Sequence, residues 1–219
     1  MIRHLLQLIW NQRKQNAWLW AELLLVSVFL WFLVDYLYVM GRTYTAPLGF
    51  DIRHTYSIVI SSLSERSPDY IPKEKRERPD GVHLLTALDR IRTYPGVESA
   101  CLTDGGMPYY MGSRNLVWRI DTLQVPCRYA FVTPEFFDVF RIYDKEGETA
   151  SLKRAIEDNN SIVISADVET MNPGLSLLGQ KAYRGNVTDE IEETIRGISV
   201  PIRRHEYTKA EPNVYRALR

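Results

Sequence analysis

The stretch that decides the architecture is Ala17–Met40, AWLWAELLLVSVFLWFLVDYLYVM, in which 21 of 24 residues are apolar or aromatic. At a rise of about 1.5 Å per residue, a helix of this length extends for roughly 36 Å, enough to cross a hydrocarbon core of about 30 Å. Tryptophans and tyrosines lie near its two ends, where amphipathic rings favour the lipid headgroups. The stretch therefore predicts a single transmembrane helix.

Two other structures would account for such an apolar stretch, namely a buried core helix and a cleaved signal peptide. A core helix seldom needs this length of nearly all-round apolarity. The apolar region of a signal peptide spans about 7–15 residues before a small-x-small cleavage site, and Tyr44-Thr45-Ala46 is a poor site of that kind. We therefore expect an uncleaved anchor.

Charge on the two sides of the stretch predicts its orientation. Residues 1–16 carry three basic side chains and no acid, whereas Asp51 offsets the two arginines that first follow the stretch. The positive-inside rule then places the N-terminus in the cytoplasm. We divide the chain into a cytoplasmic amphipathic segment (1–16), a transmembrane helix (17–40) and a periplasmic domain (41–219), with the first segment lying on the inner membrane surface.

Two acids interrupt the apolar stretch, and Glu22 is the more informative one. Asp35 is close enough to the outer end to reach the interface, whereas Glu22 lies more than one turn inside. A carboxylate at the centre of a span costs about 2.5–3.5 kcal/mol to insert. Two interpretations stay open: Glu22 reaches the inner interface or is protonated, or it makes a polar contact with another transmembrane helix. Glu22 is thus our candidate for a helix contact.

Composition limits the classes of function. The chain has 219 residues, with 27 basic and 27 acidic side chains, and 45% of it is apolar. This content excludes a disordered chain, and the balanced charge argues against a dedicated nucleic-acid binder. The sequence contains neither GxxxxGK[ST] nor GxGxxG, and its histidines lack the spacing of zinc ligands. We expect no enzymatic activity, no catalytic residues, no cofactor and no metal.

Strand and helix patterns alternate irregularly after the apolar stretch, which predicts a mixed α/β (α+β) domain. The expected helices are Val82–Ile91 and Pro134–Phe140, with a short helix or turn at Leu175–Lys181. The expected strands are Ser57–Ile60, Val97–Leu102, Leu116–Ile120, Leu123–Val132, Ser161–Ser165 and Ile195–Ile202.

Three phenylalanines lie on the expected helix Pro134–Phe140, which Thr133 caps at its N-terminal end. Phe136 and Phe140 share one face of such a helix, and Phe137 lies next to them. We expect the three rings to form a structural aromatic cluster that docks the helix on the sheet. The alternative is an exposed aromatic patch that holds an apolar cargo.

The two cysteines, Cys101 and Cys127, both fall in expected strands. An oxidising compartment permits a disulfide, but unpaired cysteines are also common in cores, and Cα atoms more than about 7 Å apart cannot be bridged. We favour two unpaired core thiols, with the disulfide as the alternative.

Four short segments, taken in order, resemble those of a known family. They are YPGVES at 94–99, VTPEFFDVFRI at 132–142, SIVIS at 161–165 and LGQK at 178–181. With the basic tip and the apolar stretch, they resemble the MacB-like and FtsX-like ABC transporter permeases, specifically the first transmembrane helix and the periplasmic core domain. That family shows a Pro-Gly-Val turn before a strand, a T/S-P-x-F/Y-F segment before a short helix, and an I-S strand followed by a G-[KQ] turn.

The resemblance implies the N-terminal part of a permease subunit in the bacterial inner membrane. Its implied partners are a cytoplasmic ABC ATPase subunit and the further transmembrane helices of the permease, and a homodimer is another option. Such permeases export or extract lipoproteins, peptides or drugs, or activate cell-wall hydrolases. Family members usually carry three more spans after the periplasmic domain, so we expect a fragment, a truncated product or one half of a split system.

A second class of protein has the same layout. A single-span extracytoplasmic sensor or ligand-binding module would also combine a basic tip, one span and an α/β body. A neighbouring gene for an ATPase would favour the permease, whereas a cytoplasmic signalling partner would favour the sensor.

Overall fold

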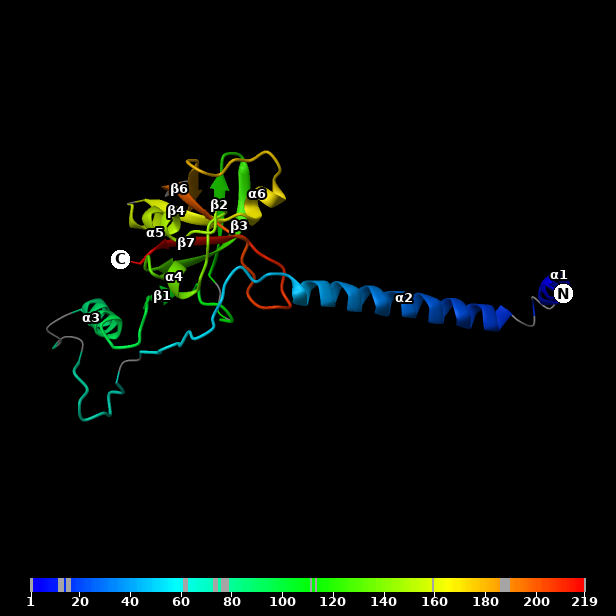
Figure 1. The fold of residues 1–219 in the computed structure, drawn as a ribbon, viewed down its shortest axis with the longest axis horizontal. Helices are drawn as coiled ribbons and strands as arrows, with labels where there is room; N and C mark the ends of the chain where they lie inside the picture. The colour runs from blue at the N-terminus through cyan, green and yellow to red at the C-terminus, as the bar shows by residue number, and fades with distance from the viewer. Residues whose placement is uncertain are drawn as a thin grey trace. The chain divides into compact units, whose positions relative to one another are not determined.

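The computed structural model describes residues 2–11, 14, 17–60, 63–72, 75, 79–110, 112, 114–158, 160–185 and 190–218. The chain forms two compact units, Met1–Ala46 and Pro47–Arg219. Figure 1 shows helices in the first unit and a β-sheet domain with short helices around it in the second.

The first unit contains helices α1 (Ile2–Asn11) and α2 (Ala17–Thr45). The 29 residues of α2 give it a length of about 44 Å, with a mean hydropathy of 2.2 over its most apolar window, and none of them is buried within the chain. α2 is the one helix in the described residues that is long and apolar enough to cross a membrane. It continues five residues beyond the predicted end at Met40 and stops two residues before Pro47, because a proline disfavours helical conformation in the residue before it.

The second unit is built on seven strands within the described residues: β1 (Thr103–Asp104), β2 (Asn115–Ile120), β3 (Leu123–Val132), β4 (Ser161–Ser165), β5 (Lys181–Arg184), β6 (Ile191–Ser199) and β7 (Asn213–Ala217). Neighbouring strands follow the order β1-β3-β2-β5-β6-β4-β7, and β7 also pairs with β3. Six strands therefore close into a ring, to which β1 is attached through β3. The pairs β3/β7 and β4/β6 are parallel and the other pairs are antiparallel.

The ring holds one hydrophobic core in its interior. Successive residues of a strand point to opposite faces, and each of the six ring strands contributes at least one side chain to this core. Its buried members on the strands are Trp118, Ile120, Val125, Cys127, Ile162, Ile164, Ala182, Ile195 and Val214.

A second core lies on the outside of the ring, under helices α4 (Phe136–Val139) and α5 (Ala150–Glu157). The outward-facing residues of β3, β4 and β7 supply the ring side of this core, and three phenylalanines supply most of the α4 side. The described residues of the unit also form helices α3 (Asp80–Arg92) and α6 (Asp167–Met171). This mixture of strands and helices confirms the predicted α+β class.

The local predictions succeed for β2, β3 and β4, which lie within one residue of the expected strands, and for the helix at Val82–Ile91, which lies within α3. The expected helix Pro134–Phe140 is shorter, since regular helix covers only Phe136–Val139. Leu175–Lys181 contains no helix: Leu178 and Gly179 form a turn, and Lys181 is the first residue of β5.

Three predicted strands are wrong in whole or in part. Ser57–Ile60 and Val97–Leu102 belong to no strand. Val59 is 87% exposed, so its β-branched side chain has no sheet to pack on. The expected strand at Ile195–Ile202 begins earlier, at Ile191, and ends at Ser199, and it is followed by β7.

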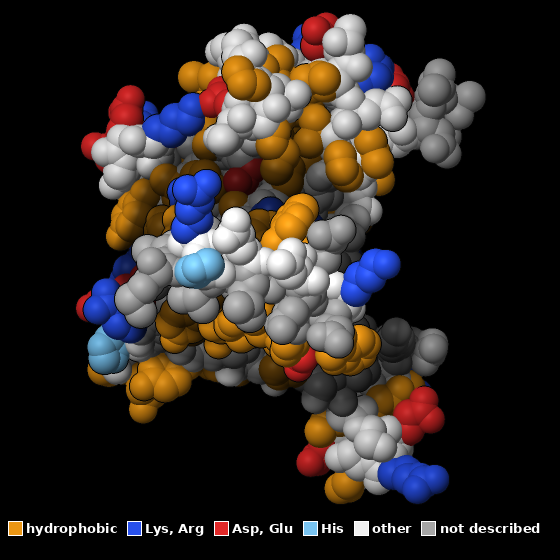
Figure 2. Space-filling view, turned by 90° about the vertical axis from the view of Figure 1, so that its right-hand side faces the viewer, with side chains coloured by type: hydrophobic (Ala, Val, Ile, Leu, Met, Phe, Trp, Pro, Cys, Tyr) orange, Lys and Arg blue, Asp and Glu red, His pale blue; other side chains and the backbone are white. Residues whose placement is uncertain are grey.

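The face of the molecule drawn in Figure 2 carries hydrophobic and charged side chains, and neither sign of charge dominates it. Figure 2 shows hydrophobic side chains in several patches, with lysines, arginines and acids between and around them. This distribution agrees with the equal numbers of basic and acidic residues in the sequence.

Candidate functional site

The segment that follows α2, Pro47–Thr55, opens the second unit and is fixed to the rest of it by backbone hydrogen bonds, and we call it the strap. The amide of Arg203 donates to the carbonyl oxygen of Leu48 at 3.0 Å. Three residues further along the strap, the amide of Asp51 donates to the carbonyl oxygen of Phe140 at 2.9 Å. The strap is thus attached both to the segment before β7 and to the C-terminal end of α4.

A cluster of charges reinforces the second attachment. Asp51 accepts hydrogen bonds from the backbone amide of Arg53 at 2.8 Å and from its guanidinium at 2.7 Å. Arg141, just after α4, lies 3.3 Å from the same carboxylate and donates to the carbonyl oxygen of Arg53 at 3.1 Å. The hydrogen bonds from the side chain and amide of Arg53, together with the charge of Arg141, lower the pKa of Asp51 to about 2.

Close packing leaves room only for glycine at one position of the strap. Gly49 has a φ of +83°, and a Cβ there would lie 2.1 Å from the carbonyl oxygen of Pro201. The next residue, Phe50, packs edge-on against Tyr109 with ring centroids 5.8 Å apart. An open hollow of about 540 Å³ is lined by Asp51, Arg53, His54, Arg141 and Tyr143.

The strap is attached to the helix that carries the predicted aromatic cluster. Phe136, Phe137 and Phe140 are 0%, 0% and 5% exposed. The ring of Phe136 lies 4.8 Å from that of Phe140 and 5.4 Å from that of Tyr215 on β7. The structure thus brings the three phenylalanines together inside the second core, and how much they stabilise the chain remains a prediction.

The other predicted residues are Glu22 and the two cysteines. Glu22 is an exposed residue in the second turn of α2, and its contact with another span stays a prediction. Cys101 is half-buried and Cys127 is buried, and both thiols are free. Within the part of the chain that the structure describes, no group of three or more His, Cys, Asp or Glu side chains is placed to hold a metal ion.

The strap was not predicted from the sequence, where Asp51 and Arg53 indicate only the orientation of the span. The local signal was present, because Pro47 and Gly49 oppose regular structure immediately after an apolar helix. The partners of the strap could not be found in this way, since Phe140 and Arg203 lie far along the chain.

Several solved structures resemble the chain, among them the following three. The first is the periplasmic region of MacB from Actinobacillus actinomycetemcomitans, with 10% sequence identity, a TM-score of 0.42, and coverage of 61% of this chain and 54% of that chain. A domain of a protein assigned as a permease, from Porphyromonas gingivalis, has 19% identity, a TM-score of 0.42, and coverage of 58% and 49%. The extracellular domain of the noncanonic ABC-type transporter YknZ from Gram-positive bacteria has 12% identity, a TM-score of 0.41, and coverage of 59% and 59%.

These structures are of the class that the sequence motifs resemble, and the chain spans about half to three fifths of their length. The likeness assigns no role to any residue. No protein-family model and no curated protein sequence matches the chain.

Proposed function

We propose that the chain is the membrane-anchored N-terminal part of an ABC transporter permease subunit of the MacB and FtsX type. In this proposal α2 crosses the bacterial inner membrane with its N-terminus in the cytoplasm, and the second unit lies in the periplasm. A separate cytoplasmic ATPase and further transmembrane helices complete the assembly, which exports a substrate or extracts it from the periplasmic side. The chain itself supplies no catalytic residues.

The observation that carries the proposal is the attachment of the strap to α4. The motif VTPEFFDVFRI, on which the family resemblance partly rests, contains α4 and the two residues whose carbonyl oxygens hold the strap. The amide of Asp51 donates to Phe140, and the hydroxyl of Thr55 donates to the carbonyl oxygen of Val139 at 3.4 Å. The strap, which follows the apolar helix, is therefore hydrogen-bonded to the segment of the second unit that carries the family motif.

This attachment provides a route for motion. A domain responds to a distant ATPase only if some element makes different contacts in two states of the assembly. A displacement of the outer end of α2 would pull on the strap, and the strap would act on α4. Because Phe136 and Phe137 of α4 contact Tyr215 of β7, the displacement would continue into the ring.

The topology is tested with cysteines introduced at Gln7 in α1 and at Lys209 in the body, both of them exposed. Burial raises the pKa of Cys101 and of Cys127 to about 12, so the native thiols should react little with maleimides at neutral pH. In whole cells, a membrane-impermeant maleimide should label the cysteine at 209 and not the one at 7. The reverse pattern would refute the topology.

Coupling is tested on the full chain purified from its native membrane. We expect an ATPase with a phosphate-binding loop to co-purify, and no ATP hydrolysis by the chain alone. Hydrogen exchange of peptides 47–55 and 132–142 should change between ATP-vanadate and ADP, with peptides of β5 and β6 as the internal control. A signalling protein in place of the ATPase, or identical exchange in both nucleotide states, would favour a sensor over a permease.

A further inference from the structure

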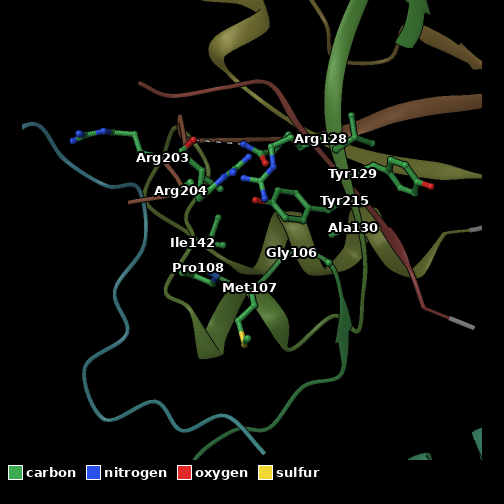
Figure 3. Close-up of a pocket in the computed structure, with 14 residues that line it drawn as sticks. Gly106, Met107, Pro108, Arg128, Tyr129, Ala130, Ile142, Arg203, Arg204 and Tyr215 are labelled. Carbon is green, nitrogen blue, oxygen red and sulfur yellow. Dashed lines mark hydrogen bonds between the residues drawn. The ribbon is translucent and has the colours of Figure 1, made fainter. Parts of the chain in front are cut away.

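A small pocket lies between the loop after β1, the middle of β3 and the segment before β7 (Figure 3). Its volume is about 20 Å³, roughly the space that one water-sized group occupies. Three arginines line it: Arg128 on β3, and Arg203 and Arg204 before β7. Figure 3 shows Arg128 and Arg204 next to each other beside the ring of Tyr215.

One of the three arginines is already engaged by the protein. Arg203 is 5% exposed, its Nε donates to the carbonyl oxygen of Thr208 at 2.7 Å, and its Nη2 donates to that of Glu206. These bonds hold the loop before β7 in place, so Arg203 forms a wall of the pocket.

Arg128 and Arg204 each have a hydrogen-bond donor without an acceptor among the described residues. Among the described residues, the Nε atoms of Arg128 and of Arg204 are buried and have no hydrogen-bond partner. The carboxylate of Glu211 lies 3.8 Å from Nη2 of Arg204, beyond hydrogen-bond distance. Buried donors without acceptors are costly and uncommon, so both groups call for an acceptor.

The charge around these donors is also unbalanced. Burial lowers the pKa of the Arg128 guanidinium, the charge of Arg204 lowers it further, and Glu211 only partly opposes them. Because guanidinium groups stay protonated in proteins, the charges of Arg128 and Arg204 add to that of Arg203 in the pocket lining, and Glu211 lies close to Arg204. A water molecule would accept the hydrogen bonds without neutralising this charge, whereas an oxyanion would do both.

We propose that this pocket binds a compact oxyanion, the size of a phosphate or carboxylate group, through Arg128 and Arg204. A volume that fits one water-sized group takes one oxygen of the oxyanion, and the rest of the group lies outside the pocket. The oxyanion comes either from solution or from the headgroup of an anionic lipid.

The test uses the full chain in phosphatidylcholine nanodiscs at pH 7, with ionic strength held constant by sodium chloride. Inorganic phosphate should raise the thermal unfolding midpoint of the wild type, because a ligand of the native state stabilises it. Arg128→Gln should weaken phosphate binding at least tenfold, and Arg128→Lys, which keeps the charge but loses the planar fork, should lie between the two. Arg196→Gln removes an arginine that is 58% exposed, and it should leave the phosphate effect intact.

Measurements without phosphate separate binding from a packing role. In that condition Arg128→Gln should unfold no lower than the wild type, since the substitution relieves the repulsion from Arg204. If it instead lowers the midpoint equally with and without phosphate, Arg128 is structural and the proposal is wrong. Arg204→Gln serves as the second variant should Arg128→Gln fail to fold.

The source of the oxyanion is resolved by exchanging the lipid. In phosphatidylglycerol nanodiscs without phosphate, a higher midpoint for the wild type but not for Arg128→Gln assigns the ligand to the headgroup. A response confined to free phosphate assigns it to solution. If neither phosphate nor phosphatidylglycerol raises the midpoint of the wild type above that of Arg128→Gln, the pocket is no oxyanion site.

Discussion

The backbone amide of Asp51 donates a 2.9 Å hydrogen bond to the carbonyl oxygen of Phe140, which lies just after the last residue of α4. This bond joins a segment that begins two residues after the apolar helix to a helix whose rings fill the second core. Arg141 follows immediately and has a φ of +49°, a left-handed conformation in which glycine or asparagine is usual. The guanidinium of the same residue, Arg141, lies 3.3 Å from the Asp51 carboxylate.

The first prediction concerns pH. The pKa of Asp51 in the folded chain, about 2, lies below the ordinary value of about 3.9 for an aspartate. Its carboxylate therefore stabilises the strap above about pH 4, and this stabilisation is lost as the pH falls from 4 through 2. Spin labels at Tyr56 and Tyr143, both exposed, should report a distance distribution that broadens over this interval.

A matched variant completes the pH test. Asp51→Asn removes the titrating group, so its distance distribution should be broad at every pH. A wild-type distribution that stays narrow down to pH 2 would show that the carboxylate does not hold the strap.

The second prediction compares two glycines with nearly the same backbone conformation. Gly49 and Gly147 have φ values of +83° and +88°, but a Cβ at Gly147 would meet nothing within 4 Å. Gly147→Ala should cost only the left-handed strain, about 1–2 kcal/mol. Gly49→Ala adds a clash with Pro201, so it should also raise hydrogen exchange in peptide 47–55, and equal exchange in both variants would contradict the packing described for the strap.

The third prediction concerns the second core. Phe136 is 0% exposed and contacts Phe140 and Tyr215, so Phe136→Ala should lower the free energy of unfolding by about 3–5 kcal/mol. Tyr94→Ala, at a ring that is 70% exposed, should change it by at most about 0.5 kcal/mol. Denaturant unfolding of the full chain in detergent measures both. An unchanged stability of Phe136→Ala with impaired cargo binding would instead favour a cargo-binding patch.

The sequence predicts well those parts of the fold that depend on neighbouring residues. β2 and β3 form a hairpin around Asp121-Thr122, and their alternation and turn are both local. β4 is recognisable because all five of its residues are buried, which gives a continuous apolar run flanked by serines. The apolar helix is also predictable from a continuous apolar run, because the composition of one stretch of sequence is enough to identify a membrane span.

Features that depend on distant pairing were not predictable from local patterns. β7 has only five residues, and its place between β3 and β4 closes the ring through contacts with residues 128–132 and 162–164. The run Ser57–Ile60 has the composition of a strand but no neighbour to pair with. The pocket residues Arg128 and Arg204 are likewise ordinary in the sequence, and only the fold brings them together.

The last prediction concerns Glu22, on the proposal that α2 contacts another transmembrane helix. Polar side chains in a membrane gain from interhelical hydrogen bonds, about 0.6 kcal/mol on average and up to about 1.7 kcal/mol. Glu22→Leu removes that bond while it makes insertion of the helix easier, so loss of the partner could not be ascribed to poor insertion. Association with the partner spans should weaken roughly 3- to 20-fold, as measured by quantitative co-purification.

Glu22→Gln should retain part of the association because an amide still forms hydrogen bonds, and Asp35→Asn, at the other acid of the helix, should retain all of it. If Glu22→Leu co-purifies like the wild type, Glu22 serves only to reach the membrane interface, and the proposed transporter assembly would then depend on other residues of α2.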